Sequence, residues 1–226
     1  MLRELLNRAC TAVFIVALVL FIITASIGLP IYIRPFYYVQ IPLWSLEEQT
    51  GHDAEKIRAA YDEVLDYLTL PDREFGTGVF AHSEEGKSHF EDCRVLFGLN
   101  AAVLLLSELC LAFLVLLTQR KCIVLSCPWG LCPSAVAGGL TLGVFALLSG
   151  LVCLDFDYAF ELFHAVMFPG KDNWLFDPRQ DEIIRALPEE FFASCAALIA
   201  LSALSISLVL LVRGIKKRKA HLMQEK

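Results

Sequence analysis

Long apolar runs alternate with polar stretches along this chain, and the lengths of the runs predict its architecture. Each of four runs contains about 20 mostly uncharged residues, the length that an α-helix needs to cross a lipid bilayer. They cover residues 10–33, 96–118, 133–154 and 191–212. The first run is longer than the ~7–15-residue apolar core of a signal peptide and lacks a small-x-small cleavage site, so we expect it to be retained. The pattern therefore predicts an all-α, polytopic membrane protein with four transmembrane helices.

The distribution of charge predicts the orientation of these spans. Basic residues gather near both ends of the chain and between the second and third runs, at Arg3, Arg8, Arg120, Lys121, Arg213, Lys216, Lys217, Arg218 and Lys219. By the positive-inside rule these three regions, including both termini, are expected to be cytoplasmic. Residues 34–94 and 155–190 are then outer loops. With 226 residues and a formal charge of −6, the chain has room for one four-helix membrane domain, residues 1–226, and no nucleic acid partner is expected.

The polar stretches contain their own local signals. Residues 50–70 have apolar positions at helical spacing and predict an amphipathic helix on the outer side. The aromatic residues at 36–44 are typical of the headgroup layer. Ser88 followed by Glu91 has the pattern of a capping box, which predicts that a helix begins near His89. Further along, residues 155–164 continue the helical register of the third run, and Asp177–Pro178 predicts the start of a short helix to about residue 187.

Histidines and carboxylates near the outer ends of two runs are the candidate chemistry. His89 shares a predicted helix face with Asp92, and His164 shares one with Asp157 and Glu161. An imidazole titrates near neutral pH, so two of them can act as general base and general acid. We expect Asp92 to orient His89, and Asp157 or Glu161 to orient His164.

Other polar residues leave alternatives open. Glu108 lies near the middle of the second run, either as a protonated, hydrogen-bonded structural residue or as a functional one. Cys122, Cys127 and Cys132 lack the paired spacing of a zinc site, although such a site stays possible. The histidines also lack the HExxH spacing of a metalloenzyme. From these residues alone, the chain is an enzyme, a non-enzymatic four-span accessory protein or a metal-dependent membrane hydrolase.

Two blocks of sequence resemble one known family. Residues 88–97, with the sequence SHFEDCRVLF, resemble the H-x-x-D-V segment before the second span of the bacterial lipoprotein intramolecular transacylases. Residues 160–192 resemble the F-x-x-F-H, W-x-x-D-P and L-P-x-x-F-F elements of the same family. The resemblance extends to the number and orientation of the spans. Cys93 is a departure, because the family commonly has valine there.

The resemblance implies a specific activity. The enzyme would move the sn-2 acyl chain of a diacylglyceryl lipoprotein to the α-amine of its amino-terminal cysteine, without a cofactor or metal, at the outer leaflet of a bacterial cell membrane. Its partners would be this lipoprotein and membrane lipid, while the oligomeric state stays open. The implied catalytic pair is His89 and His164, in either order of base and acid. Arg94, Asn173 and Trp174 are candidate donors to the developing oxyanion.

Overall fold

The computed structural model describes residues 1–224, and these residues form helices and loops without a strand. In this described part, four helices are long and apolar enough to cross a membrane. They are α1 (Leu2–Tyr32), α6 (Glu84–Gln119), α7 (Pro133–Leu154) and α9 (Glu189–Gln224). The prediction of an all-α membrane protein with four spans is confirmed. α1, α6 and α9 extend beyond their apolar runs, because charged residues continue each helix at one or both ends.

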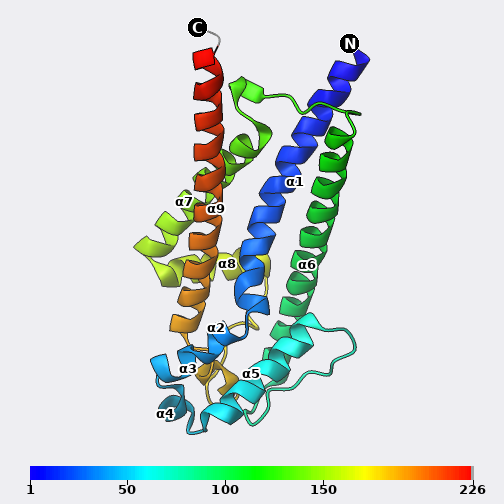
Figure 1. Ribbon diagram of the computed structural model, residues 1–226. Helices are drawn as coiled ribbons and strands as arrows, with labels where there is room; N and C mark the ends of the chain where they lie inside the picture. The colour runs from blue at the N-terminus through cyan, green and yellow to red at the C-terminus, as the bar shows by residue number, and fades with distance from the viewer. Residues whose placement is uncertain (225–226) are drawn as a thin grey trace. The chain divides into compact units, whose positions relative to one another are not determined.

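The chain forms two compact units, and each long helix contributes residues to both. Unit 1 contains Met1–Ile27, Ala101–Gly150 and Ile199–Lys226, with the short 3₁₀ helix η1 (Pro128–Gly130). Its first residues, its loop between α6 and α7 and the end of α9 lie at one end (Figure 1). The basic regions of the chain therefore share one end of this unit. That end is expected to be cytoplasmic.

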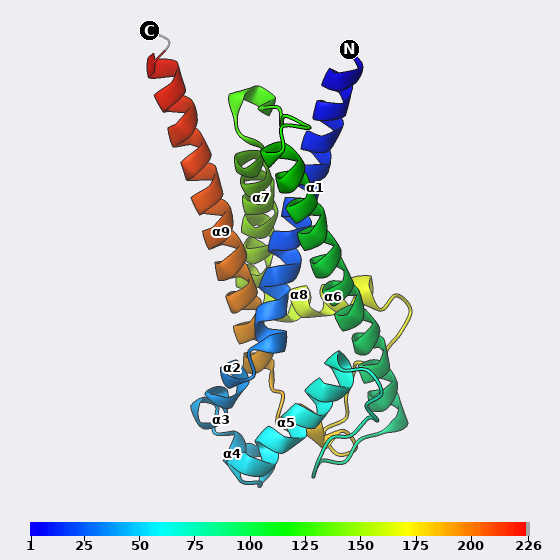
Figure 2. The same ribbon diagram turned by 45° about the vertical axis from the view of Figure 1, so that its right-hand side comes forward.

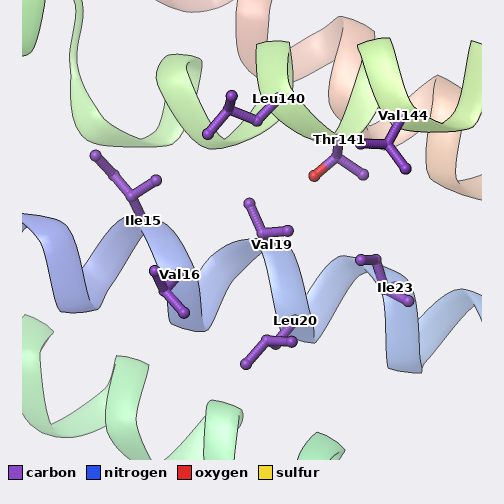
Figure 3. Close-up of a pocket in the computed structure, with 8 residues that line it drawn as sticks. All are labelled: Ile15, Val16, Val19, Leu20, Ile23, Leu140, Thr141 and Val144. Carbon is purple, nitrogen blue, oxygen red and sulfur yellow. The ribbon is translucent and has the colours of Figure 1, made fainter.

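Unit 1 is held together by apolar contacts and close helix packing. Ile22, Phe145 and Ala203 form a buried cluster with side chains from α1, α7 and α9. Between α1 and α7 lies an apolar pocket of about 210 Å³ (Figure 3). The Thr141 hydroxyl points toward α1 in this view. Glu108 is exposed on α6, so the buried hydrogen bond expected of a structural residue is not formed here.

Gly138 allows α7 to approach α9 closely, and its replacement by alanine tests this packing. A Cβ atom at Gly138 would lie 2.7 Å from the backbone oxygen of Ser207, whereas one at Gly143 would meet nothing within 4 Å. Both changes gain the same helix propensity, so their difference isolates the clash. We expect Gly138→Ala to destabilise the protein by about 1–3 kcal/mol relative to Gly143→Ala. Thermal unfolding in detergent measures this difference, and equal midpoints would contradict it.

Unit 2 contains Gly28–Asn100 and Leu151–Leu198. Besides the ends of the long helices, its described elements are α2 (Pro35–Tyr38), α3 (Gln40–Leu43), α4 (Leu46–Thr50), α5 (Ala54–Thr69), α8 (Phe156–Met167) and the 3₁₀ helix η2 (Glu182–Arg185). α5 confirms the predicted amphipathic helix, although it begins at Ala54 rather than near residue 50. The reason is local: the Asp53 side chain accepts a hydrogen bond from Lys56 N and caps the helix.

The core of unit 2 is aromatic. Tyr37 is completely buried and stacks on Tyr61 with ring centroids 3.8 Å apart, and Phe191 packs edge-on against both rings. The Tyr37 hydroxyl donates a hydrogen bond of 2.7 Å to the Ala186 carbonyl. Tyr37 thus belongs to the core of the unit. The contact joins α2 to the segment before α9.

Candidate active site

The helix that carries His89 begins one turn earlier than predicted. The Ser83 carbonyl accepts from Lys87 N, and its hydroxyl accepts from Gly86 N at 2.9 Å, so Ser83 rather than Ser88 is the N-cap. Ser83 is itself fixed, because its backbone N–H and hydroxyl both donate to Asp181. His89 therefore lies in the second turn of an anchored helix.

His89 is enclosed by aromatic side chains and by the second histidine. Its side chain is 8% exposed, and its ring centroid lies 5.0 Å from that of Phe168 and 5.5 Å from that of Phe176. The ring centroid of His164 is 5.8 Å away. Nε2 lies 3.4 Å from the Cys93 sulfur, whereas Nδ1 is buried without a hydrogen-bond partner among residues 1–224. Nδ1 is thus the nitrogen left for other chemistry.

His164 is on α8, and its helix is separate from α7. Residues 155–164 do not continue α7, which corrects the prediction of one unbroken helix. Asp155 has an extended backbone (φ −159°, ψ 102°), and its side chain accepts from Tyr158 N at 2.9 Å. This N-cap satisfies a donor of the new helix and ends the old one. α8 is therefore free to take its own direction.

The environment of His164 fixes its tautomer. The side chain is 6% exposed, and its ring stacks on Trp174 with centroids 4.4 Å apart. Nδ1 lies 2.8 Å from the Phe160 carbonyl oxygen. A carbonyl only accepts hydrogen bonds, so Nδ1 carries the proton and Nε2 keeps a lone pair in the neutral ring. Burial lowers the pKa of His164 below its ordinary 6.5, although the bond to Phe160 partly opposes this shift.

The predicted carboxylate partners of the histidines are not their partners in the structure. Asp92 accepts hydrogen bonds from Lys171 Nζ at 2.5 Å and Asn173 Nδ2 at 3.0 Å, and not from His89. Asp157 and Glu161 are exposed, and the Phe160 carbonyl takes the place expected for them. Asp92 instead joins α6 to the segment that follows α8.

The three candidate oxyanion donors are already engaged. Arg94 donates to the Leu70 and Arg73 carbonyls. Trp174 Nε1 donates to the Lys171 carbonyl at 3.2 Å. Asn173 Nδ2 donates to Asp92, and its Oδ1 is buried without a partner in the described part of the chain. These residues therefore hold loops and rings in place through the bonds that they form.

Several contributors to the site could not be found by sequence reasoning. Lys171 pairs with Asp92 across 79 positions of sequence, and Cys93 contacts His89 one turn along its helix. The aromatic wall had a weak signal in the frequent phenylalanines at 160–176. The segment after Asp177 differs from the short helix that the sequence predicted. Asp177 accepts a hydrogen bond from Arg179 N in a turn, and the regular element that follows is the 3₁₀ helix η2.

The side chains that the structure describes include no group of three or more His, Cys, Asp or Glu placed to hold a metal ion. Cys122, Cys127 and Cys132 belong to no such group. The fold and this pair of enclosed imidazoles define the class of protein: a multi-pass helical membrane protein with a buried histidine site.

Comparison with known proteins identifies the family. Residues 12–192 match the family model described as "Lipoprotein intramolecular transacylase Lit", and the chain belongs to this family. A solved structure of Lit from Bacillus cereus is 24% identical with a TM-score of 0.83, covering 96% of this chain and 99% of that chain. A variant of that protein with one histidine changed to alanine is 22% identical with a TM-score of 0.78, covering 97% and 98%. Among curated proteins, none matches.

Family membership makes this protein a bacterial transacylase of the membrane that acts on lipoproteins. The expectation drawn from the two histidine blocks is confirmed at this level.

Proposed function

We propose that this protein transfers the sn-2 acyl chain of a diacylglyceryl lipoprotein to the α-amine of its amino-terminal cysteine, with His164 as base and His89 as acid. The observation that carries the proposal is the facing pair of buried imidazoles, 5.8 Å apart between centroids, inside an aromatic enclosure. Donor ester and acceptor amine belong to one substrate molecule, so the reaction needs no cofactor. Holding the two groups together supplies much of the rate enhancement.

The tautomers support this division of roles. His164 has its Nδ1 proton fixed on the Phe160 carbonyl, so its Nε2 lone pair can accept a proton from the attacking amine. A Cys93 thiol that donates to Nε2 of His89 leaves the proton of that ring on Nδ1. Nδ1–H of His89 then donates to the departing sn-2 oxygen. The aromatic wall keeps water from competing with the amine for the ester.

The steps conserve atoms and protons. The amine nitrogen attacks the ester carbonyl and forms a tetrahedral adduct, and His164 takes the proton that the nitrogen releases. The adduct collapses, the bond to the sn-2 oxygen breaks, and that oxygen takes a proton from His89. The products are an amide and a free sn-2 hydroxyl. His164 then holds one extra proton and His89 lacks one. Transfer of a proton from His164 to His89 returns both rings to their starting state.

The proposed topology follows from charge. The basic end of unit 1 is cytoplasmic, the residues of unit 2 face the outer side, and residues 1–226 work as one membrane domain. Accessibility of a cysteine-reactive, membrane-impermeant label to a cysteine introduced at residue 85 in intact cells tests the outer location, with the native Cys122 as an inner reference. Labelling at residue 85 only after the cells are opened would contradict it.

The test of activity is conversion of a diacylglyceryl lipopeptide by the purified protein in liposomes. Substrate and product are isomers, so the parent mass is unchanged. Fragmentation must show the acyl chain on nitrogen, and an amine-reactive label must report loss of the free amine. We expect conversion without added cofactor and in the presence of a chelator. An amine that stays free in the wild type, under conditions where the protein is folded, contradicts the proposal.

The pH dependence of this activity tests the role of His164. Because burial lowers the pKa of His164, its neutral form persists below pH 6.5. Besides the limb of the substrate α-amine, whose ordinary pKa is about 7.7–8.0, kcat/KM should show a second acid limb, and this second limb should lie below pH 6.5. The same shift affects stability: the unfolded chain binds the proton first as pH falls. The contribution of His164 to stability is therefore complete above pH 6.5, declines as pH falls from 6.5 toward the folded pKa, and is lost below that pKa. A second acid limb above pH 6.5 contradicts the assignment. His52→Asn, outside the site, serves as the control and should leave the limb in place.

A further inference from the structure

Two amphipathic helices of unit 2 differ in the kind of surface that they expose. α5 buries its apolar residues and exposes charged ones, among them Glu55, Lys56 and Arg58. α8 instead leaves a broad apolar face outside the protein: Tyr158, Leu162, Phe163, Val166 and Met167 are all exposed. An exposed surface of this kind marks an interaction site.

The helical positions of α8 divide it into three faces. At 100° per residue, the half-buried Phe160 lies on the same side as the buried His164. Asp157 and Glu161 lie together along one edge. The exposed apolar residues occupy the remaining arc, which is about half of the circumference. A helix with an apolar face beside a charged edge is amphipathic, and amphipathic helices can lie at a boundary between hydrocarbon and water.

The connection to α7 places α8 at such a boundary. The 22 residues of α7 form a helix about 33 Å long, close to the ~30 Å thickness of the hydrocarbon core. Leu154, its last residue, therefore lies near the edge of that core, and α8 begins two residues later. Within unit 2, α8 runs across the direction of the adjoining part of α6 (Figures 1 and 2). Because α6 crosses the bilayer, a helix across it lies parallel to the membrane surface.

We propose that α8 lies in the interfacial layer of the bilayer with its exposed apolar face against lipid acyl chains and its acidic edge toward water. The occupant of this face is membrane lipid, because α8 continues from a membrane-spanning helix and its exposed aromatic and aliphatic side chains match that environment.

The consequence for catalysis rests on the proposed function. His164 is on the face of α8 opposite to the lipid contact, so the depth of α8 sets the depth of His164 at the level where lipid ester bonds lie. A lipid-anchored substrate then approaches along the surface of α8 without leaving the membrane.

Photo-crosslinking tests the lipid contact independently of activity. A benzophenone amino acid is placed at Val166, at Glu161 on the acidic edge, or at Leu105, an exposed position of the α6 span, and the protein is reconstituted in vesicles of phosphatidylcholine and phosphatidylglycerol. Mass spectrometry after illumination should find lipid adducts at 166 and 105 and few at 161. Adducts at 105 but none at 166 overturn the proposal. A crosslink from 166 to a second copy of the protein also overturns it.

A charge on the lipid face tests the consequence. Val166→Asp should lower the conversion rate in vesicles by about tenfold or more, since a carboxylate is costly in hydrocarbon. Val79→Asp, which changes an exposed valine in the loop before α6, is the matched control and should stay near wild type. If lipid adducts form at 166 but Val166→Asp keeps full activity, the effect on the depth of His164 is refuted while the lipid contact stands. If the wild type converts no substrate, the adducts still decide the lipid contact.

Discussion

Replacing either His89 or His164 by alanine is expected to lower the conversion rate by about 10²–10⁴-fold, the usual contribution of a general acid or base. His164→Ala removes the lone pair that accepts the amine proton, and His89→Ala removes the donor to the leaving oxygen. Because both proton transfers are needed for one turnover, the double variant should be little worse than the single ones. Rates come from fragment mass spectrometry of the lipopeptide in liposomes.

The controls for this experiment are the histidines outside the enclosure. His82 bonds to Thr77, and His52 packs edge-on against Phe80, so alanine at either position should leave conversion close to that of the wild type. Thermal unfolding must show that the inactive variants are folded. If both His89→Ala and His164→Ala convert substrate at the wild-type rate, the pair has a structural role and the proposed mechanism fails.

Asp92→Asn is expected to reduce kcat by about 10–100-fold, because a misplacement of catalytic groups by about 1 Å can have an effect of this size. Asp92 accepts hydrogen bonds from Lys171 and Asn173. It thereby connects the helix of His89 to the segment that contains Trp174, whose ring stacks on His164. Asparagine keeps the size of the side chain but removes the charge that Lys171 pairs with. The predicted effect is on positioning, so kcat should fall more than KM rises.

Asp172→Asn is the matched control for this change. Asp172 is an exposed neighbour in the same segment and loses the same charge. It should behave like the wild type in kcat, KM and thermal stability. Lys171→Met should reproduce the loss of kcat seen in Asp92→Asn, since it removes the other half of the ion pair. Equal kinetics for the Asp92 and Asp172 variants would show that this connection has no part in catalysis.

The sequence predicted the long helices and the two histidine segments that lie together in the structure. Four apolar runs of sufficient length leave a membrane helix as the only structure that satisfies every backbone group in hydrocarbon. For that reason the fold class could be read without tertiary information. The two histidine blocks were also recognisable, since their motifs are local in sequence, and the family to which they point is confirmed.

The breaks and caps within these helices were predicted less well. Ser88 and Glu91 have the pattern of a capping box, yet Ser83 caps α6 because Asp181, far along the chain, holds it in place. Residues 155–164 have helical periodicity throughout, yet Asp155 turns its side chain to cap α8 and so ends α7. In both places the periodicity was compatible with two structures, and a specific side-chain bond selected one.

The sequence by itself thus determined the membrane class, the number of spans, the amphipathic character of α5 and the two histidines as candidates. Only the tertiary structure decided the partners of those histidines. Asp92 stood one turn from His89 in the predicted helix, but Lys171 and Asn173 take its oxygens, and the backbone carbonyl of Phe160 holds His164 in place of a carboxylate. Hydrogen bonds depend on distances of a few tenths of an ångström between atoms that can be far apart in sequence. Helical periodicity places residues on a face, but it does not choose which neighbour across the fold they meet.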